Sequence, residues 1–170
     1  ADPASTDPVA RESTRLFCAG VRVPQTSLDP QQLKAWLTKI TYGGHAFDVK
    51  NDEFLEARDR LLPWINAYSP YAHVSVDDPP VGIYYDKNLE GDLGAHSPQF
   101  GFQLQKRCKE LGLLCEVRYA QFNGYRQDEA TLYLIQTLTG PAPENQSAQF
   151  DVSAHNKPLP AFNPGTRLLF

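Results

Sequence analysis

Residues 77–85, with the sequence DDPPVGIYY, decide the fold class of this chain. The two prolines fix their own φ angles and restrict the residues before them, so Asp77 to Pro80 should form a stiff, extended segment. The run VGIYY that follows is short and apolar, which is typical of a strand buried on both faces of a sheet. The polar residues 86–95 then predict a loop at the carboxyl end of this strand, where parallel sheets usually carry their chemistry.

Two similar strands are predicted on either side of this one in the sequence. Leu16 to Val23 is an almost unbroken apolar run that Pro24 stops, and we expect it to be buried on both faces. Residues 114–119 form the third run, directly after Gly112, which suits the left-handed end of a preceding helix. The chain therefore shows about three strands.

Helical patterns separate the strands. Apolar residues recur at helical spacing in four segments: from Pro30 (with Asp29 as its N-cap) to Gly43-Gly44, from about Asp52 through a kink at Pro63, over 100–111, and over 128–138. The alternation of strands and helices predicts an α/β fold with a parallel sheet, right-handed crossovers and helices on both sheet faces.

The chain is long enough for one domain with a modest core. It has 170 residues, of which 41% are hydrophobic, and we assign residues 1–140 to the domain and the Pro-, Asn- and Gln-rich residues 141–170 to a tail. The charges that give the net value of −4 are interspersed, which argues against nucleic acid or an anionic lipid surface as a partner. No apolar stretch reaches the roughly 18 residues of a membrane-spanning helix.

The three cysteines fit neither a disulfide framework nor a zinc site, and no pattern predicts a metal or a cofactor. Cys18 lies in an apolar run and is interpreted as a buried thiol. Cys108 and Cys115 fall at a helix end and a strand start, so a bridge between them is one alternative in an oxidising compartment and two free thiols are the other.

Several segments carry a resemblance to a known family. Segments of bacterial α/β-hydrolase esterases and lipases of a planctomycete-type branch resemble five stretches of this chain: residues 5–14 with the strand that follows, 25–30 (QTSLDP), 68–81 (YSPYAHVSVDDPPV), 96–101 (HSPQFG) and 111–115 (LGLLC). The resemblance covers roughly residues 1–138 and implies the C-terminal half of an α/β-hydrolase fold. It also implies that residues 29–68 are an inserted, cap-like helical segment.

The resemblance implies a serine nucleophile in a G-x-S-x-G turn that lies before the segment matched here. No such turn occurs among the 170 residues, and no methionine is present, so we expect the sequence to begin inside a longer precursor or after a cleavage. The expected partner is the N-terminal half of the same fold, or a second protomer, that covers the open sheet. The expected substrate is a small ester or an acylated saccharide.

The candidate acid and histidine depart from the family pattern. The family's catalytic acid falls at Asn88, which can hold an imidazole but cannot stabilise its charged form, so Asp86 or Asp92 would have to replace it. The family's histidine position, within residues 119–127, contains no histidine. His96 is the candidate base, and its alternative role is a helix cap or a packing residue.

The other candidate residues have plainer interpretations. His73 is expected to be a hydrogen-bonded structural histidine, and His45 either lines a cleft or lies in an ordinary loop. The aromatic residues of the cap-like segment either line an apolar or sugar-binding cleft or pack between helices: Trp36, Tyr42, Phe47 and Trp64.

Two functions follow as hypotheses. In the first, the chain joined to its N-terminal half hydrolyses a carboxylic ester, with acetyl or feruloyl groups on polysaccharides as candidate substrates. In the second, the catalytic apparatus has decayed and the fold binds a ligand or a partner chain. The family resemblance and the possible bridge give a slight lean toward an exported protein, although the compartment stays open.

Overall fold

A three-stranded parallel sheet forms the centre of the computed structural model, which describes residues 2–12, 15–37, 42–85, 94–119 and 129–140. The strands are β1 (Ala19–Arg22), β2 (Val81–Tyr85) and β3 (Cys115–Tyr119), in the spatial order β1-β2-β3. Val81 pairs with Ala19 on one side and with Cys115 on the other, so the three strands start at one edge. The predicted α/β class with a parallel sheet is confirmed.

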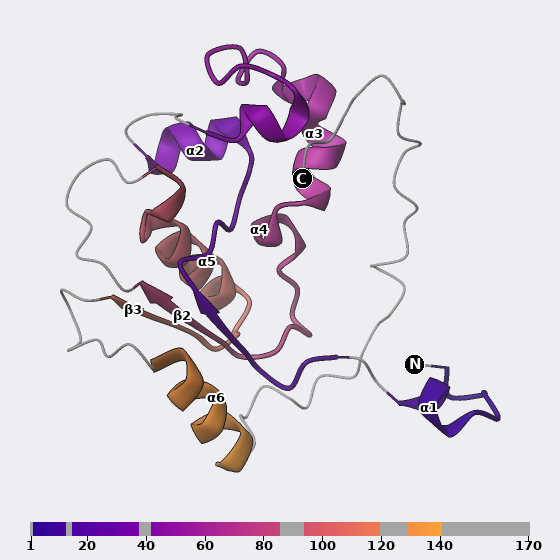
Figure 1. Cartoon of the computed structure of the whole chain (residues 1–170). Coiled ribbons are helices and arrows are strands. Elements are labelled where there is room, and N and C mark those ends of the chain that lie inside the picture. The colour runs from indigo at the N-terminus through magenta and orange to yellow at the C-terminus, as the bar shows by residue number, and fades with distance from the viewer. Residues whose placement is uncertain (1, 13–14, 38–41, 86–93, 120–128, 141–170) are drawn as a thin grey trace.

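Helices cover both faces of this sheet, as expected. Helix α5 (Gln99–Glu110) packs against β3 on one face, and α6 (Glu129–Thr139) packs against β1 and β2 on the other (Figure 1). A buried cluster fills the space under α5 and consists of Ile83, Tyr85, Leu104, Cys108 and Leu113. Because the apolar residues of β2 lie between two helical layers, this strand could be recognised as an unbroken apolar run.

Helix α6 approaches the sheet closely at a glycine. A Cβ atom on Gly82 would lie 2.8 Å from the ring of Tyr133 and 2.9 Å from that of Tyr84, which is too close for an unstrained contact. The absence of a side chain at this position therefore sets the distance between α6 and β2.

We expect Gly82→Ala to lower the free energy of unfolding by about 1–3 kcal/mol, because the added methyl overpacks the α6 interface. Urea unfolding measures the change. The loss should be smaller in a Tyr133→Ala background, where one of the two obstructing rings is gone, and an equal loss in both backgrounds would contradict the explanation that α6 is overpacked.

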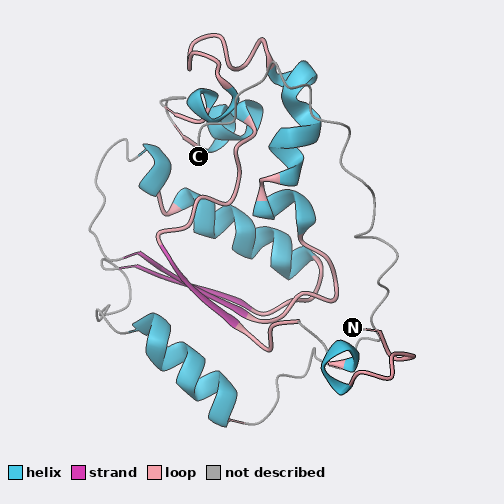
Figure 2. Cartoon of the chain, turned by 45° about the vertical axis from the view of Figure 1, so that its right-hand side comes forward, coloured by secondary structure: helices cyan, strands magenta, loops and turns pink. Residues whose placement is uncertain are grey.

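Four further helices lie on the α5 side of the sheet (Figure 2). They are α2 (Pro30–Trp36), the 3₁₀ helix η1 (Gly44–Phe47), α3 (Arg58–Ala67) and α4 (Pro70–His73). Their core contains Leu33, Leu37, Phe47, Phe54, Leu61, Ile65 and Phe100. Since Phe47 is in this core and Trp36, Tyr42 and Trp64 pack against it, the structure favours core packing for these aromatic residues.

Several predicted boundaries were wrong. Strand β1 is shorter than expected, and Leu16 and Phe17 are 66% and 40% exposed. The neighbouring segment explains this: the ladder begins where the Ala19 amide donates to the Pro80 carbonyl (2.9 Å), and Pro79 and Pro80 have no amide hydrogens to continue it backwards. Cys18, next to this point, is buried as predicted.

The helix ends also differ. Helix α2 ends at Trp36, before the expected glycine pair, and the stretch from Asp52 forms turns until α3 begins at Arg58, with Pro63 inside it. The short α1 (Pro8–Arg11) begins at Asp7, whose carboxylate accepts a hydrogen bond from the Val9 amide. Within the described part of the chain, no helix combines the length and the hydropathy needed to cross a bilayer.

Candidate functional site

The carboxyl edge of the sheet is the candidate functional site, and two contacts between distant segments organise it. The hydroxyl of Tyr85, the last residue of β2, donates to the Pro24 carbonyl at 3.3 Å. The buried hydroxyl of Thr26 donates to the Phe100 carbonyl at 3.0 Å. The segment after β1 and the start of α5 are thus fixed against the end of β2, at the edge where open α/β sheets bind ligands.

Aromatic rings surround the start of α5 at this edge. Phe100 contacts Trp36 and Tyr42 edge to face, with ring centroids 6.2 and 6.1 Å apart, and Trp36 also contacts Tyr71 at 4.9 Å. The Tyr42 hydroxyl is buried and has no hydrogen-bond partner among the described residues. Burial, followed by the neighbouring Tyr85, raises the pKa of Tyr42, so this hydroxyl stays protonated and can act only as a neutral donor or acceptor.

His96 lies at this edge, on the 3₁₀ helix η2 (Gly94–His96) that leads into α5, and its side chain is exposed. Next to it, the Ser97 hydroxyl accepts a hydrogen bond from the Gln99 amide (3.3 Å), while Pro98 is the N-cap residue of α5 and makes no side-chain cap hydrogen bond. Ser97 is buried, whereas His96 is exposed. His96 is therefore accessible to a ligand.

The two candidate acids lie outside the described residues. Asp86 and Asp92 belong to the stretch 86–93, as does Asn88, and the segment 120–128 after β3 is likewise outside. Their distances to His96 are therefore not defined, and their catalytic roles stay predictions.

The other two described histidines have the plainer roles. The Nε2 atom of His73 lies 3.3 Å from the Ala67 carbonyl oxygen, in agreement with a structural histidine. His45 is exposed on η1. Neither residue belongs to the contacts that organise the carboxyl edge.

The two aspartates of the DDPP segment lie at the amino edge of the sheet, before the start of β2. Asp77 accepts hydrogen bonds from the Ser75 hydroxyl (2.6 Å) and from the Arg15 guanidinium, and these contacts, that of Ser75 first, lower its pKa. Asp78 accepts a hydrogen bond from the Ser75 amide at 2.9 Å. These carboxylates therefore fix the entry to β2 and are not available for catalysis.

A second buried acid holds the helical segment together. Asp29 caps α2 by accepting a hydrogen bond from the Gln31 amide (2.9 Å), as the sequence predicted. It also forms a bidentate ion pair with Arg58, with both N–O distances at 2.7 Å. Sequence patterns gave no sign of this pair, because its partners are 29 residues apart.

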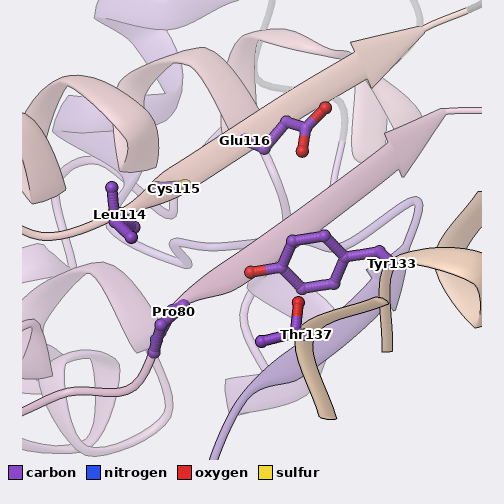
Figure 3. A pocket seen from close by; sticks show the side chains of 6 residues that line it. All are labelled: Pro80, Leu114, Cys115, Glu116, Tyr133 and Thr137. Atoms are coloured by element: carbon purple, nitrogen blue, oxygen red, sulfur yellow. The ribbon is translucent and has the colours of Figure 1, made fainter. Parts of the chain in front are cut away.

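Two cavities lie near the amino edge, and the sequence predicted neither. The first, of about 250 Å³, lies between α6 and the sheet (Figure 3) and is lined by Pro80, Leu114, Cys115, Glu116, Tyr133 and Thr137. The second, of about 540 Å³, lies beside α5 and also includes Cys115. Both lie away from His96, so they are separate from the carboxyl-edge site.

In the part of the chain that the structure describes, no three His, Cys, Asp or Glu side chains are grouped closely enough to hold a metal ion. The chain also has no match among protein-family models, curated proteins or solved structures. The class that the structure defines is an α/β fold with a three-stranded parallel sheet.

Proposed function

We propose that this chain supplies two members of a serine-type catalytic triad, the histidine and the acid, at the carboxyl edge of its sheet. The complete site would hydrolyse a carboxylic ester. The observation that carries the proposal is the placement of an exposed His96 at this edge, directly after the loop that follows β2. In serine hydrolases of the α/β type, the acid and the histidine follow the nucleophile in chain order, which fits a serine contributed from outside these residues. The partner would be the N-terminal half of the fold or a second protomer.

The proposed chemistry gives each residue one task. His96 would accept the proton of the serine hydroxyl as the serine attacks the ester carbonyl, and would later donate it to the leaving alcohol. Asp86 or Asp92 would accept a hydrogen bond from the other imidazole nitrogen and stabilise the charged ring. A small ester or an acylated saccharide is the proposed substrate.

The test uses the protein purified from cells that produce it, under conditions that keep any bound partner chain attached. Turnover of p-nitrophenyl acetate, labelling by a fluorophosphonate and intact mass under denaturing conditions are measured on the same sample. We expect a labelled second species and turnover that falls roughly 10²–10⁴-fold in His96→Gln, because the general base is lost.

His45→Gln is the matched control, since His45 is also an exposed histidine on a short 3₁₀ helix. It should retain the turnover of the unaltered protein. An active complex that loses nothing when His96 is replaced would overturn the assignment of the base.

A second candidate function is ligand binding without turnover. It is favoured by Asn88 at the acid position and by the absence of histidine from residues 119–127. This function predicts a lone 19.0 kDa species that neither reacts with the fluorophosphonate nor turns over ester, yet retains a non-hydrolysed ester analogue in equilibrium dialysis.

A further inference from the structure

Two cysteines lie at the amino edge of the sheet, whereas His96 lies at the carboxyl edge. Cys108 belongs to the last turns of α5 and is 4% exposed, whereas Cys115 begins β3 and is half-buried. Cys108 belongs to the buried cluster under α5, and Cys115 packs against that cluster. Neither thiol has a role in the proposed ester chemistry.

The backbone around the pair is fixed by contacts on both sides. The Leu113 amide donates to the Cys108 carbonyl at 2.9 Å, and the Gln105 side-chain amide donates to the Cys115 carbonyl at 2.9 Å. The left-handed Gly112, with φ of 74°, lets the chain reverse between helix and strand. These contacts fix the backbone of both cysteines on either side of the turn.

The cavity beside α5 gives the pair access to small molecules. It has a volume of about 540 Å³, and its wall includes Cys115, the ring of Phe102 and the stems of Lys106 and Lys109. Both lysines are exposed, while the acid nearest to them in the sequence, Glu110, pairs with Arg107 at 3.4 Å. The cavity thus places positive charge beside the more accessible of the two thiols.

We propose that Cys108 and Cys115 are a redox-active dithiol that an anionic low-molecular-weight disulfide, of the glutathione type, oxidises from this cavity. The Cys115 sulfur, having lost its proton, attacks one sulfur of the bound disulfide, forms a mixed disulfide and releases the first thiolate. The Cys108 sulfur then attacks that of Cys115 and releases the second. The two cysteine protons end on the two released thiols, so one disulfide is reduced as one is formed.

Access, and not pKa, sets the order of attack, because Cys115 lines the cavity and Cys108 is only 4% exposed. The hydrogen bond from Cys115 lowers the pKa of Cys108, and that same bond and burial raise the pKa of Cys115. Cys108 is therefore the better thiolate of the two, and the attack by Cys115 requires that its proton first pass to Cys108 or to solvent.

The experiment is oxidation of the native, fully reduced chain by oxidised glutathione, followed by alkylation, intact mass and peptide mapping. We expect two of the three cysteines to become resistant to alkylation and the mapped bridge to join Cys108 to Cys115. Cys18→Ser should leave this result unchanged. Cys108→Ser should stop at a mixed disulfide on Cys115, because the resolving thiol is missing.

The role of Lys106 and Lys109, which line the cavity, is tested by the rate of oxidation. The Lys106→Glu, Lys109→Glu double variant should be oxidised roughly tenfold more slowly by oxidised glutathione at low salt but equally fast by neutral 2-hydroxyethyl disulfide. Glutathione attached to Cys18, or no Cys108–Cys115 bridge in the unaltered chain, would overturn the dithiol. An equal slowing with both oxidants would overturn recognition by the lysines. None of these readouts depends on ester turnover.

Discussion

Asp29→Ala is expected to lower the free energy of unfolding by about 3 kcal/mol, one of the two largest effects of any single substitution considered in this chain. Asp29 is 5% exposed and makes two hydrogen bonds of 2.7 Å to Arg58. Its removal leaves the guanidinium, whose side chain is only 23% exposed, without its main anionic partner, and it removes the N-cap of α2. Guanidinium chloride unfolding, followed by circular dichroism, measures the loss.

Asp59 provides a control for this prediction. It also pairs with Arg58, at 3.4 Å, but its side chain is 96% exposed. Solvent screens such a pair, so Asp59→Ala should change stability little. Equal losses for the two alanine variants would mean that burial of Asp29 is not what makes its ion pair important.

The same pair predicts a pH dependence with a definite sign. Burial opposes the ionised form of Asp29, but the hydrogen bonds from Arg58 and Gln31 outweigh it, so the pKa is lowered from its ordinary value of 3.8. The unfolded chain then binds a proton at a higher pH than the native chain does. The stabilisation is therefore fully present above about pH 4 and is lost as the pH falls through the native pKa. The stability of Asp29→Asn should fall less on acidification than that of the unaltered chain.

Local sequence was sufficient to predict those elements whose boundaries depend on neighbouring residues. The bounds of β2 were predicted correctly because Pro80 precedes an apolar run and a polar stretch follows it. The end of α5 was predicted because Gly112 supplies the left-handed conformation after the helix. By contrast, β1 was predicted too long, since its start depends on prolines about 60 residues away that cannot extend the ladder.

The candidate site was predictable only in part for a related reason. The apolar run and polar loop indicated which edge of the sheet to examine, and the structure places an exposed His96 there. The Arg58 and Arg15 ion pairs could not be predicted, because their partners are 29 and 62 residues away and no local pattern indicates them. The esterase resemblance and the roles of Asp86 and Asp92 stay predictions.

Phe100→Ala is expected to cost about 3–5 kcal/mol, since it removes a large, fully buried ring. Phe100 has no exposed surface and joins α5 to the helical segment above it through edge-to-face contacts with Trp36 and Tyr42. Thermal unfolding and urea titration both measure the loss. Phe100→Leu should cost less than Phe100→Ala, because most of the volume is kept.

Phe102, two residues further along α5, gives the matched control because its ring is only half-buried. Phe102→Ala should destabilise the chain clearly less than Phe100→Ala, and equal losses would contradict the view that Phe100 connects two layers.

Phe100→Ala also bears on the proposed site. Phe100 lies four residues after His96, and its carbonyl accepts a hydrogen bond from the Thr26 hydroxyl. The loss of its ring should therefore increase amide hydrogen exchange at the start of α5 earlier than in β2. Uniform exchange across both elements would show instead that the carboxyl edge opens only when the whole domain unfolds.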